Sequence, residues 1–506
     1  MKEIYTNLLV SVVTTLLLFG MLEGLTRLYV WGQTDMSFSI KKDLVQLVDN
    51  INISDNTFNI YYLGGSTVEG GFFGEGFTIP NIIDYMHDHE IQGKDIRSIN
   101  IAKSGEDFYY NLKRLRIITS NKDTFKPSLV VIYSGHNEFL KFHQNYGLQL
   151  DSAPLEWLME HSLLLKKIAA RLQLFKLEIN ERMFSDEPLF GNDQYKAVID
   201  KYQSELEEAV QLLTENGIPV IISTVAGNYT GWQPNRSIYC SNKQDKDFWR
   251  LIQRGESAEL ASDFNNALNY YQQALHLCKN FAETHYRLGK IYEALSEYDK
   301  ALEAYNKAVD LDGMPLRASS IQNDFIKTLN SDKSVFVVDA VKALQEKSDT
   351  GLIGFNLMMD GHHPNRQGYL IISNLIAQKI TDIFDTELSE LHDIELDRTR
   401  EIFDMDDNVY FVHYVSIGRW FAKLSTWRYD PGERLNMSEE SFLKAMELDD
   451  SRYESYLGLA TVNFLRKNSV KAEEYLAKAK SIDEQHVGDY LKGHWVQAII
   501  KYADDN

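Results

Sequence analysis

Five short apolar runs, separated by segments of helical pattern, constrain the fold of this chain more than any other feature. Each run is rich in β-branched or aromatic residues, as buried strands are. The runs are Phe58–Leu63, Arg97–Ala102, Leu129–Ser134, Pro219–Thr224 and Val335–Asp339. The clearest helix between them is Lys196–Asn216, which Gly217 ends. The alternation predicts an α/β fold with a doubly wound, five-stranded parallel sheet.

A repeat with a period of 34 residues interrupts this pattern between the fourth and fifth runs. Small residues where helices cross, and an aromatic residue before the last alanine, are typical of tetratricopeptide (TPR) repeats. The four positions Gly255, Ala267, Tyr271 and Ala274 recur as Gly289, Ala301, Tyr305 and Ala308. The sequence therefore predicts an inserted pair of TPR units, with ordinary amphipathic hairpins as the alternative.

The carboxyl-terminal region fits the same template more loosely. The matching positions are Tyr456, Leu459, Ala460, Ala472 and Ala479, with Phe442 and Ala445 one period before Leu476 and Ala479. A further degenerate unit would then have its first helix near 409–424. We predict five segments: an anchor at 1–34, the sheet domain at 35–248 and 318–388, the insert at 249–317, and a helical TPR-like domain at 389–506.

The amino terminus carries an apolar segment without charged residues, Ile4–Leu22. As a helix it would span about 28 Å, close to the thickness of a bilayer core. We therefore predict an uncleaved single-span membrane anchor at residues 4–22, with the bulk of the chain on the outer, periplasmic or extracytoplasmic side. A cleaved signal peptide and a buried helix are the alternatives, although no A-x-A-like cleavage site follows the run.

Charge and cysteine content exclude some classes of function. Lysine and arginine total 52 against 73 acids, so the net charge is −21 and we expect no nucleic-acid binding. The two cysteines, Cys240 and Cys278, cannot form a four-thiolate zinc site. One disulfide between them is allowed, but their spacing matches no motif, and we expect two thiols. We also expect no metal and no cofactor.

Four polar clusters follow predicted strands, and in a doubly wound sheet ligands bind at the carboxyl ends of strands. The clusters are Gly64-Gly65-Ser66-Thr67, Ser104-Gly105, Gly135-His136-Asn137-Glu138 and Asp360-Gly361-His362-His363-Pro364-Asn365. They offer a hydroxyl at a strand tip, a glycine N–H, an amide donor, and a carboxylate beside an imidazole. Together these groups are typical of a serine hydrolase with an oxyanion hole.

In the order and placement of these motifs the chain resembles the SGNH (GDSL-like) hydrolase family, over roughly 55–245 and 318–385. The resemblance implies that Ser66 is the nucleophile, His363 the general base and Asp360 its orienting partner, with Gly105 and Asn137 as oxyanion donors. His362 is the adjacent alternative for the base. Two positions depart from the family pattern: Gly65 stands where aspartate is better known, and Glu138 where aspartate is usual.

We therefore predict a membrane-anchored serine esterase that acts on an acylated small molecule or polysaccharide, such as an acyl ester of an envelope carbohydrate. An O-acyltransferase of the same chemistry is one alternative, because a sugar hydroxyl can replace water at the acyl-enzyme. The other alternative is a TPR-based scaffold in a membrane complex, with a non-catalytic SGNH domain. In each case the repeats would bind a protein partner.

Overall fold

The structure is a computed structural model that describes residues 36–140, 192–239, 246–331, 333–428 and 431–493, with a few further positions. The chain forms two compact units, residues 1–46 with 145–181 and residues 47–144 with 182–506. The helix α2 (Met36–Ile51) crosses from the first unit into the second. The remaining elements described below belong to the second unit.

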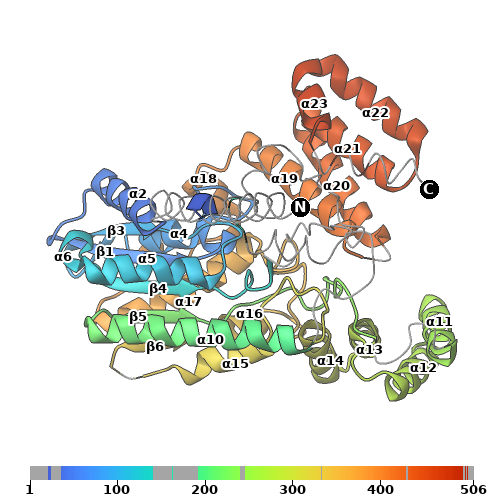
Figure 1. The fold of residues 1–506 in the computed structure, drawn as a ribbon, viewed down its shortest axis with the longest axis horizontal. Coiled ribbons are helices and arrows are strands. Elements are labelled where there is room, and N and C mark those ends of the chain that lie inside the picture. The colour runs from blue at the N-terminus through green and yellow to red at the C-terminus, as the bar shows by residue number, and fades with distance from the viewer. Residues whose placement is uncertain are drawn as a thin grey trace, which may run out of the picture. The chain divides into compact units, whose positions relative to one another are not determined.

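A six-stranded sheet forms the centre of the second unit, in the order β2-β3-β1-β4-β5-β6 (Figure 1). The strands are β1 (Thr57–Gly64), β2 (Glu90–Ile91), β3 (Lys94–Asn100), β4 (Leu129–Tyr133), β5 (Val220–Ser223) and β6 (Val335–Val338). The five predicted runs form the five strands that pair in parallel. Ile60, Val131 and Ile221, from three neighbouring strands, are buried in the core.

The predicted five-stranded, wholly parallel sheet needs one correction, because β2 adds a sixth strand that pairs antiparallel with β3. Gln92 and Gly93 connect the two strands, with φ angles of 51° and 73°. Positive φ at both central residues is typical of the type I′ turn that joins two-residue hairpins. A strand of two residues is too short to show an apolar pattern, so no pattern in the sequence predicts it.

Helices cover both faces of the sheet. Helix α5 (Phe108–Ser120) packs against α10 (Asn192–Glu215), and α4 (Ile79–Met86) packs against α17 (Arg366–Phe384). After β3 the chain crosses back past β1 to β4, so the strand order reverses beside β1. Ligands bind at such a switch point in doubly wound sheets. The shorter helices here are α3 (Ser66–Glu69), α6 (Lys122–Phe125), α15 (Ser320–Thr328) and α16 (Ala340–Glu346).

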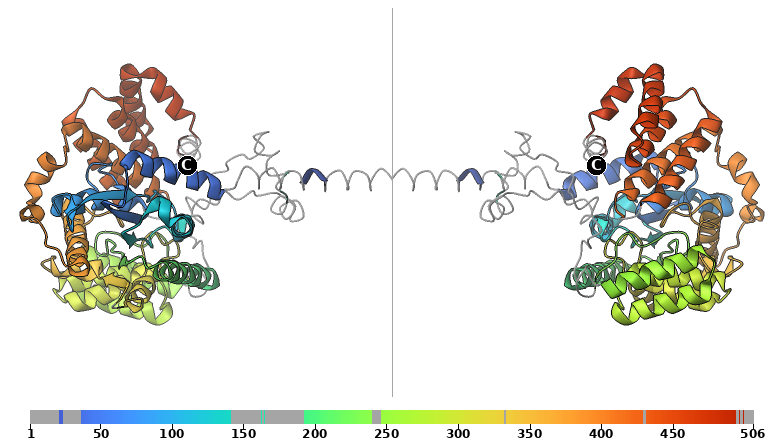
Figure 2. Two further views of the ribbon diagram at one scale, coloured as in Figure 1. Left: turned by 90° about the vertical axis from the view of Figure 1, so that its left-hand side faces the viewer. Right: turned by 90° about the vertical axis from the view of Figure 1, so that its right-hand side faces the viewer.

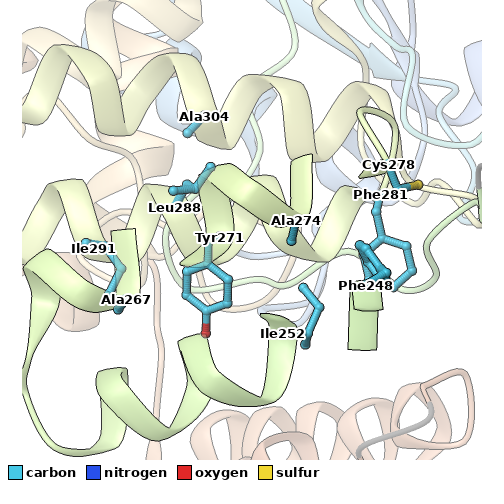
Figure 3. Close-up of a cluster of buried hydrophobic side chains, with 10 residues drawn as sticks. All are labelled: Phe248, Ile252, Ala267, Tyr271, Ala274, Cys278, Phe281, Leu288, Ile291 and Ala304. Carbon is cyan, nitrogen blue, oxygen red and sulfur yellow. The ribbon is translucent and has the colours of Figure 1, made fainter. Parts of the chain in front are cut away.

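The insert consists of two helical hairpins. Its helices are α11 (Lys246–Leu260), α12 (Phe264–Leu277), α13 (Ala282–Ala294) and α14 (Tyr298–Asp310). Figure 3 shows Tyr271 within the buried cluster of this region. A Cβ atom on Gly255 would lie 2.5 Å from the Tyr271 ring, and one on Gly289 would lie 2.6 Å from the Tyr305 ring. The 34-residue repeat is thus a repeated contact between a glycine and a tyrosine of the next helix.

The carboxyl-terminal region also forms helical hairpins, in which α19 packs against α20 and α21 against α22. Its elements are η2 (Glu390–His392), η3 (Leu396–Arg398), α18 (Thr399–Ile402), α19 (Asp407–Ser425), α20 (Gly432–Leu448), α21 (Tyr453–Leu465), α22 (Ser469–Ile482) and α23 (Glu484–Leu491). The Phe442 ring contacts both Gly418 and Gly458, where no Cβ atom separates the helices. The helix expected near 409–424 is α19.

Both helical regions lie on the same side of the sheet, to the right in Figure 1. In both views of Figure 2 the carboxyl-terminal helices (orange to red) lie above and the insert (yellow-green) below. They meet at the loop that follows β5. The Tyr286 hydroxyl of the insert donates to the Thr230 carbonyl at 2.8 Å, and Glu283 forms a buried ion pair with Arg428 at 3.3 Å. The predicted domain boundaries at 34, 248, 317 and 388 stay predictions.

Two further expectations concern the amino terminus and the cysteines. In the described ranges, no helix is long and apolar enough to cross a membrane. The predicted span 4–22 lies outside those ranges apart from Met21 and Leu22, so it stays a prediction. The expectation of two thiols is wrong, because Cys278 is disulfide-bonded. Cys240, the other cysteine, lies outside the described residues. Sequence spacing does not show which cysteines the tertiary fold brings together.

Candidate active site

The Gly64-Gly65-Ser66-Thr67 motif lies where the strand β1 ends and a short helix begins. β1 ends at Gly64 and α3 begins at Ser66. A Cβ atom on Gly64 would collide with the Tyr133 carbonyl, and one on Gly65 would collide with the Asn137 side-chain nitrogen. The two glycines therefore let the end of β1 lie against the end of β4, with the Asn137 side chain next to Gly65, the residue before Ser66. In this chain the close approach of Asn137 requires glycine at position 65.

Three predicted residues form a hydrogen-bonded chain. The Nε2 atom of His363 lies 2.7 Å from Oγ of Ser66, and its Nδ1 atom lies 2.7 Å from Oδ2 of Asp360. The other Asp360 oxygen accepts the backbone N–H groups of His362 at 2.8 Å and His363 at 2.7 Å. The Asp-x-x-His turn thus fixes both the carboxylate and the imidazole. This is the arrangement in which an imidazole takes the proton of a serine hydroxyl.

The electrostatics keep the Asp360 carboxylate charged. Burial alone would raise the pKa of Asp360, but the electrostatic interactions with His363 and His362, the hydrogen bond from the His363 ring and the hydrogen bond from the His362 backbone N–H hold the pKa below its usual value. A buried, ionised carboxylate next to His363 Nδ1 fixes the tautomer that leaves Nε2 facing Ser66. It also stabilises the imidazolium that forms when the serine proton is transferred.

The structure decides between the two adjacent histidines for the position next to the serine. His363, rather than His362, contacts Ser66. Burial, reinforced by the electrostatic interaction with the neighbouring His363, lowers the pKa of His362 to about 3. Its ring lies 4.7 Å from the ring of His136, which is also buried and accepts the Ala318 backbone N–H at 3.0 Å. His362 is therefore a neutral, buried neighbour of the site.

The two predicted oxyanion donors belong to neighbouring loops. Gly105 lies in an exposed turn after β3 with a φ angle of +76°, which favours glycine. The Asn137 amide donates one hydrogen bond to the Glu106 carbonyl at 3.0 Å. A carboxamide nitrogen carries two hydrogens, so the same group has a second donor for a substrate oxygen. Asn137 thus holds the Gly105 loop while it lies beside the serine. The donor roles themselves stay predictions.

Glu69 also holds the Gly105 loop, and the sequence analysis missed it. It is the last residue of α3, three positions after Ser66. Its carboxylate accepts the Ser104 backbone N–H at 2.7 Å and also the Ser104 hydroxyl. It therefore joins the helix that begins at Ser66 to the turn that contains Gly105. A glutamate on a short helix after Ser66 is the only sequence signal for this contact.

Glu138 stands where the SGNH pattern usually has aspartate, and it forms a hydrogen bond with the helix α5. Its carboxylate accepts the Phe108 backbone N–H at 3.1 Å, at the start of α5. Burial, reinforced by the charge of Asp107, raises the pKa of Glu138 to about 8. The side chain therefore fixes the helix that follows the Gly105 loop. It makes no direct contact with Ser66 or His363 among the contacts of the described residues.

The loop after β5 forms hydrogen bonds with the backbone of the Asp360 turn. The Asn228 side chain donates to the Asp360 carbonyl at 2.9 Å, and the Asn228 N–H donates to the Gly361 carbonyl at 2.9 Å. The buried Arg317, just after the insert, binds the carbonyls of Asn228 and Trp232. These contacts were not predicted, because they join loops that lie about 90 and 130 residues apart.

One cluster in the described part of the chain has the residue types of a metal site. Asp360, His362 and His363 offer ligand atoms within 4.8 Å of one another. Two of these three side chains are already bonded to each other, and His363 also faces Ser66. A metal ion there would compete with the hydrogen bonds that form the Ser66–His363–Asp360 chain.

Known families match the insert. The tetratricopeptide repeat model matches residues 282–313, and a TPR repeat model matches residues 261–296. An uncharacterized protein of Methanocaldococcus jannaschii, MJ1281, is 20% identical over 366 residues, which are 70% of this chain. The chain spans only 31% of the length of that curated relative.

Three solved structures of esterase type show a partial likeness. An acylhydrolase of Bacteroides fragilis described as putative is 15% identical with a TM-score of 0.27, covering 65% of this chain and 90% of its own. A GDSL-like lipase of Bacteroides thetaiotaomicron is 15% identical with a TM-score of 0.27, covering 66% and 95%. The acetyl xylan esterase AlAXEase is 12% identical with a TM-score of 0.29, covering 64% and 100%.

The prediction of tetratricopeptide repeats in the insert is confirmed by the family models. The looser prediction for the carboxyl-terminal helices lies outside both matched ranges and stays a prediction. Residues 261–313, which include the helices α12 to α14, therefore contain tetratricopeptide repeats.

Proposed function

We propose that this protein is a serine ester hydrolase of the SGNH type. The observation that carries the proposal is the Ser66–His363–Asp360 chain, with its two contacts of 2.7 Å. His363 Nε2 takes the Ser66 proton as Oγ attacks an ester carbonyl. The tetrahedral oxyanion then receives hydrogen bonds from the N–H groups of Ser66 and Gly105 and from the Asn137 amide. Each such donor typically lowers the barrier by about 3–4 kcal/mol.

The second half of the reaction returns the enzyme to its starting state. The intermediate expels the alcohol, which receives the proton from His363, and leaves an acyl group on Ser66. Water then gives a proton to His363 and attacks the acyl carbonyl, releasing the acid and restoring the Ser66 hydroxyl. With a sugar hydroxyl in place of water, the same steps would transfer the acyl group.

We further propose that the enzyme is anchored by residues 4–22 on the outer side of a membrane and acts on acyl esters of an envelope carbohydrate. The uncharged apolar segment at the amino terminus supports an anchor. The disulfide at Cys278 supports an exported protein, because disulfides persist in oxidising compartments.

The experiment is the hydrolysis of nitrophenyl acetate by the purified protein and by Ser66→Ala. We expect the substitution to lower kcat/KM at least about a thousandfold, because it removes the nucleophile. A fluorophosphonate probe should label Ser66 in the original protein, and His363→Ala should stop the labelling. Equal rates in the original protein and Ser66→Ala, or labelling of another residue, would refute the proposal.

The matched repeats support a second function, the binding of a partner protein by the insert. Stacked TPR hairpins present a concave surface that binds other proteins. A photo-crosslinking residue placed at Leu260, which is 89% exposed at the end of α11, should form a defined adduct in the native host. The same residue placed at the exposed Glu75, far along the chain from the insert, should not.

A further inference from the structure

The loop that follows the nucleophile helix is packed against α19 of the carboxyl-terminal region. His413 of α19 is 6% exposed and stacks on the Phe73 ring, with centroids 4.7 Å apart and planes 6° apart. Burial lowers the pKa of this imidazole to about 4, and the neighbouring Phe72 backbone partly opposes the shift. The Phe72 and His413 rings also lie edge to face, with centroids 6.3 Å apart. A helix more than 300 residues away along the chain thus fixes this loop.

Phe72 lies between α19 and the candidate catalytic histidine. Its ring meets the His363 imidazole edge to face, with centroids 4.8 Å apart and planes at 66°. The ring is half-buried and packs against an apolar cluster that includes Ile417 and Phe421 of α19. One side of Phe72 is therefore held by the carboxyl-terminal helix, and another borders the general base.

The position next to His363 has a defined role in ester cleavage. The imidazole donates its proton to the departing alcohol, so the alcohol part of the substrate must lie beside Nε2 of His363. An aromatic ring there offers a flat apolar face. Such a face suits the C–H surface of a cyclic alcohol, such as a sugar ring, better than a short linear alcohol or water.

We propose that Phe72, positioned by His413 of α19, selects substrates whose alcohol part is a ring. The inference rests on the proposed ester hydrolase and names the class of alcohol that the site accepts. It also makes the carboxyl-terminal helices part of the active site, because α19 supplies the residue that holds Phe72.

The test compares esters that share one acyl group and differ only in the alcohol: cyclohexyl acetate, acetylated methyl glucoside and ethyl acetate. The measured quantity is the ratio of kcat/KM for each cyclic ester to that for ethyl acetate. This ratio does not depend on the fraction of folded enzyme. We expect Phe72→Ala to lower the ratio about fivefold, the size of one lost ring contact, and Phe72→Leu to lower it less.

His413 is tested through the same ratio. His413→Ala should lower the ratio in the same direction as Phe72→Ala, and His413→Phe should restore it, because a phenyl ring can stack on Phe73 as the imidazole does. Val412→Ala is the matched control, since Val412 is a neighbouring α19 residue that is 46% exposed. An unchanged ratio in Phe72→Ala overturns the inference. An unchanged ratio in His413→Ala alone overturns the role of α19.

The result also separates this inference from the proposed function. If the original protein hydrolyses none of the three acetates and fails to cleave nitrophenyl acetate, the ester-hydrolase proposal itself is refuted. If it cleaves them with ratios that Phe72→Ala leaves unchanged, the hydrolase proposal stands and only the alcohol selectivity is wrong.

Discussion

Two side chains near Ser66, the proposed nucleophile, form hydrogen bonds with the loop that contains Gly105, a proposed oxyanion donor. Glu69 forms this link from the nucleophile helix, and Asn137 forms it from the end of β4. An oxyanion donor works only when it already points to the place where charge develops, so small displacements of the loop lower the rate. The residues that hold the loop should therefore influence kcat more than substrate binding.

Glu69→Ala tests this coupling. Loss of the carboxylate frees the Ser104 N–H, and the Gly105 turn is no longer tied to α3. We expect kcat to fall about tenfold or more with little change in KM, because only the transition state uses the oxyanion donors. Glu69→Gln keeps an acceptor oxygen and should recover most of the rate. Glu75→Ala, an exposed glutamate nearby, is the control. A raised KM with an unchanged kcat would contradict the prediction.

Glu138 makes folding stability depend on pH. Burial, and then the charge of Asp107, raises the pKa of Glu138 from its usual 4.5 to about 8 in the folded protein. Between these values the folded state binds a proton that the unfolded state has lost. Stability from this group is thus complete below about pH 4.5 and is lost as the pH rises through about 8.

Glu138→Gln keeps the acceptor for the Phe108 N–H but cannot ionise. Between pH 5 and pH 9 we expect the melting temperature of the original protein to fall more than that of Glu138→Gln. The difference should be about 2–4 °C for each kcal/mol of stability that the original protein loses. At pH 9 the variant should be the more stable protein. If the melting temperatures of the two proteins change equally with pH across this range, Glu138 does not titrate as described.

At the scale of elements, the insert is held by a glycine and a tyrosine in each hairpin. The Tyr305 hydroxyl donates to Glu293 at 2.6 Å, and its ring fills the space that a side chain at Gly289 would occupy. Tyr271 makes the corresponding contact with Glu259 at 2.8 Å. The repeated sequence positions are therefore the positions where the two helices of a hairpin come closest.

Gly289→Ala should destabilise the insert, because the new Cβ would lie 2.6 Å from the Tyr305 ring. Overpacking of this kind costs about 1–3 kcal/mol, which a melting curve or urea titration will detect. Gly488→Ala on α23 is the control, since a Cβ there meets no atom within 4 Å. Equal stabilities for the two variants would show that the Gly289–Tyr305 contact can accept a Cβ atom without loss of stability.

At the scale of the whole molecule, the insert and the carboxyl-terminal helices are joined by buried charges. Arg428 and Glu283 form an ion pair in which the side chains are 2% and 5% exposed. Arg428 also donates to the Pro234 carbonyl of the loop after β5. The three segments meet at one point, and the same loop holds the Asp360 turn through Asn228.

Arg428→Ala should therefore destabilise the fold, by less than the about 3–5 kcal/mol that an uncompensated buried charge costs, because Glu283 keeps its ion pair with Arg287 at 3.0 Å. Replacing both residues, as in Arg428→Met with Glu283→Leu, should recover much of the loss. The exposed pair Lys300–Glu297 is the control, and Lys300→Ala should change the stability by no more than about 1 kcal/mol. A loss no larger than the control would mean that the pair does not join the segments.

The sequence alone predicted the five strands that pair in parallel, a helix at 196–216 that the structure has at 192–215, the two hairpins of the insert, and the side chains of Ser66, His363 and Asp360 that lie together. These features follow from local signals: apolar runs bounded by turns, an exact 34-residue period, and short motifs at strand ends. A parallel sheet brings strand ends to one edge, so residues placed there by pattern meet in space.

Only the tertiary structure decided which side chains support these residues. Glu69, Phe72, Arg317 and His413 act through contacts with segments that are distant in sequence, where neither period nor motif predicts a partner. The edge strand β2 and the disulfide at Cys278 were missed for related reasons, because one is too short for a pattern and the other depends on how loops pack. Local pattern reflects the burial of individual elements, whereas the contacts between elements depend on their packing in three dimensions.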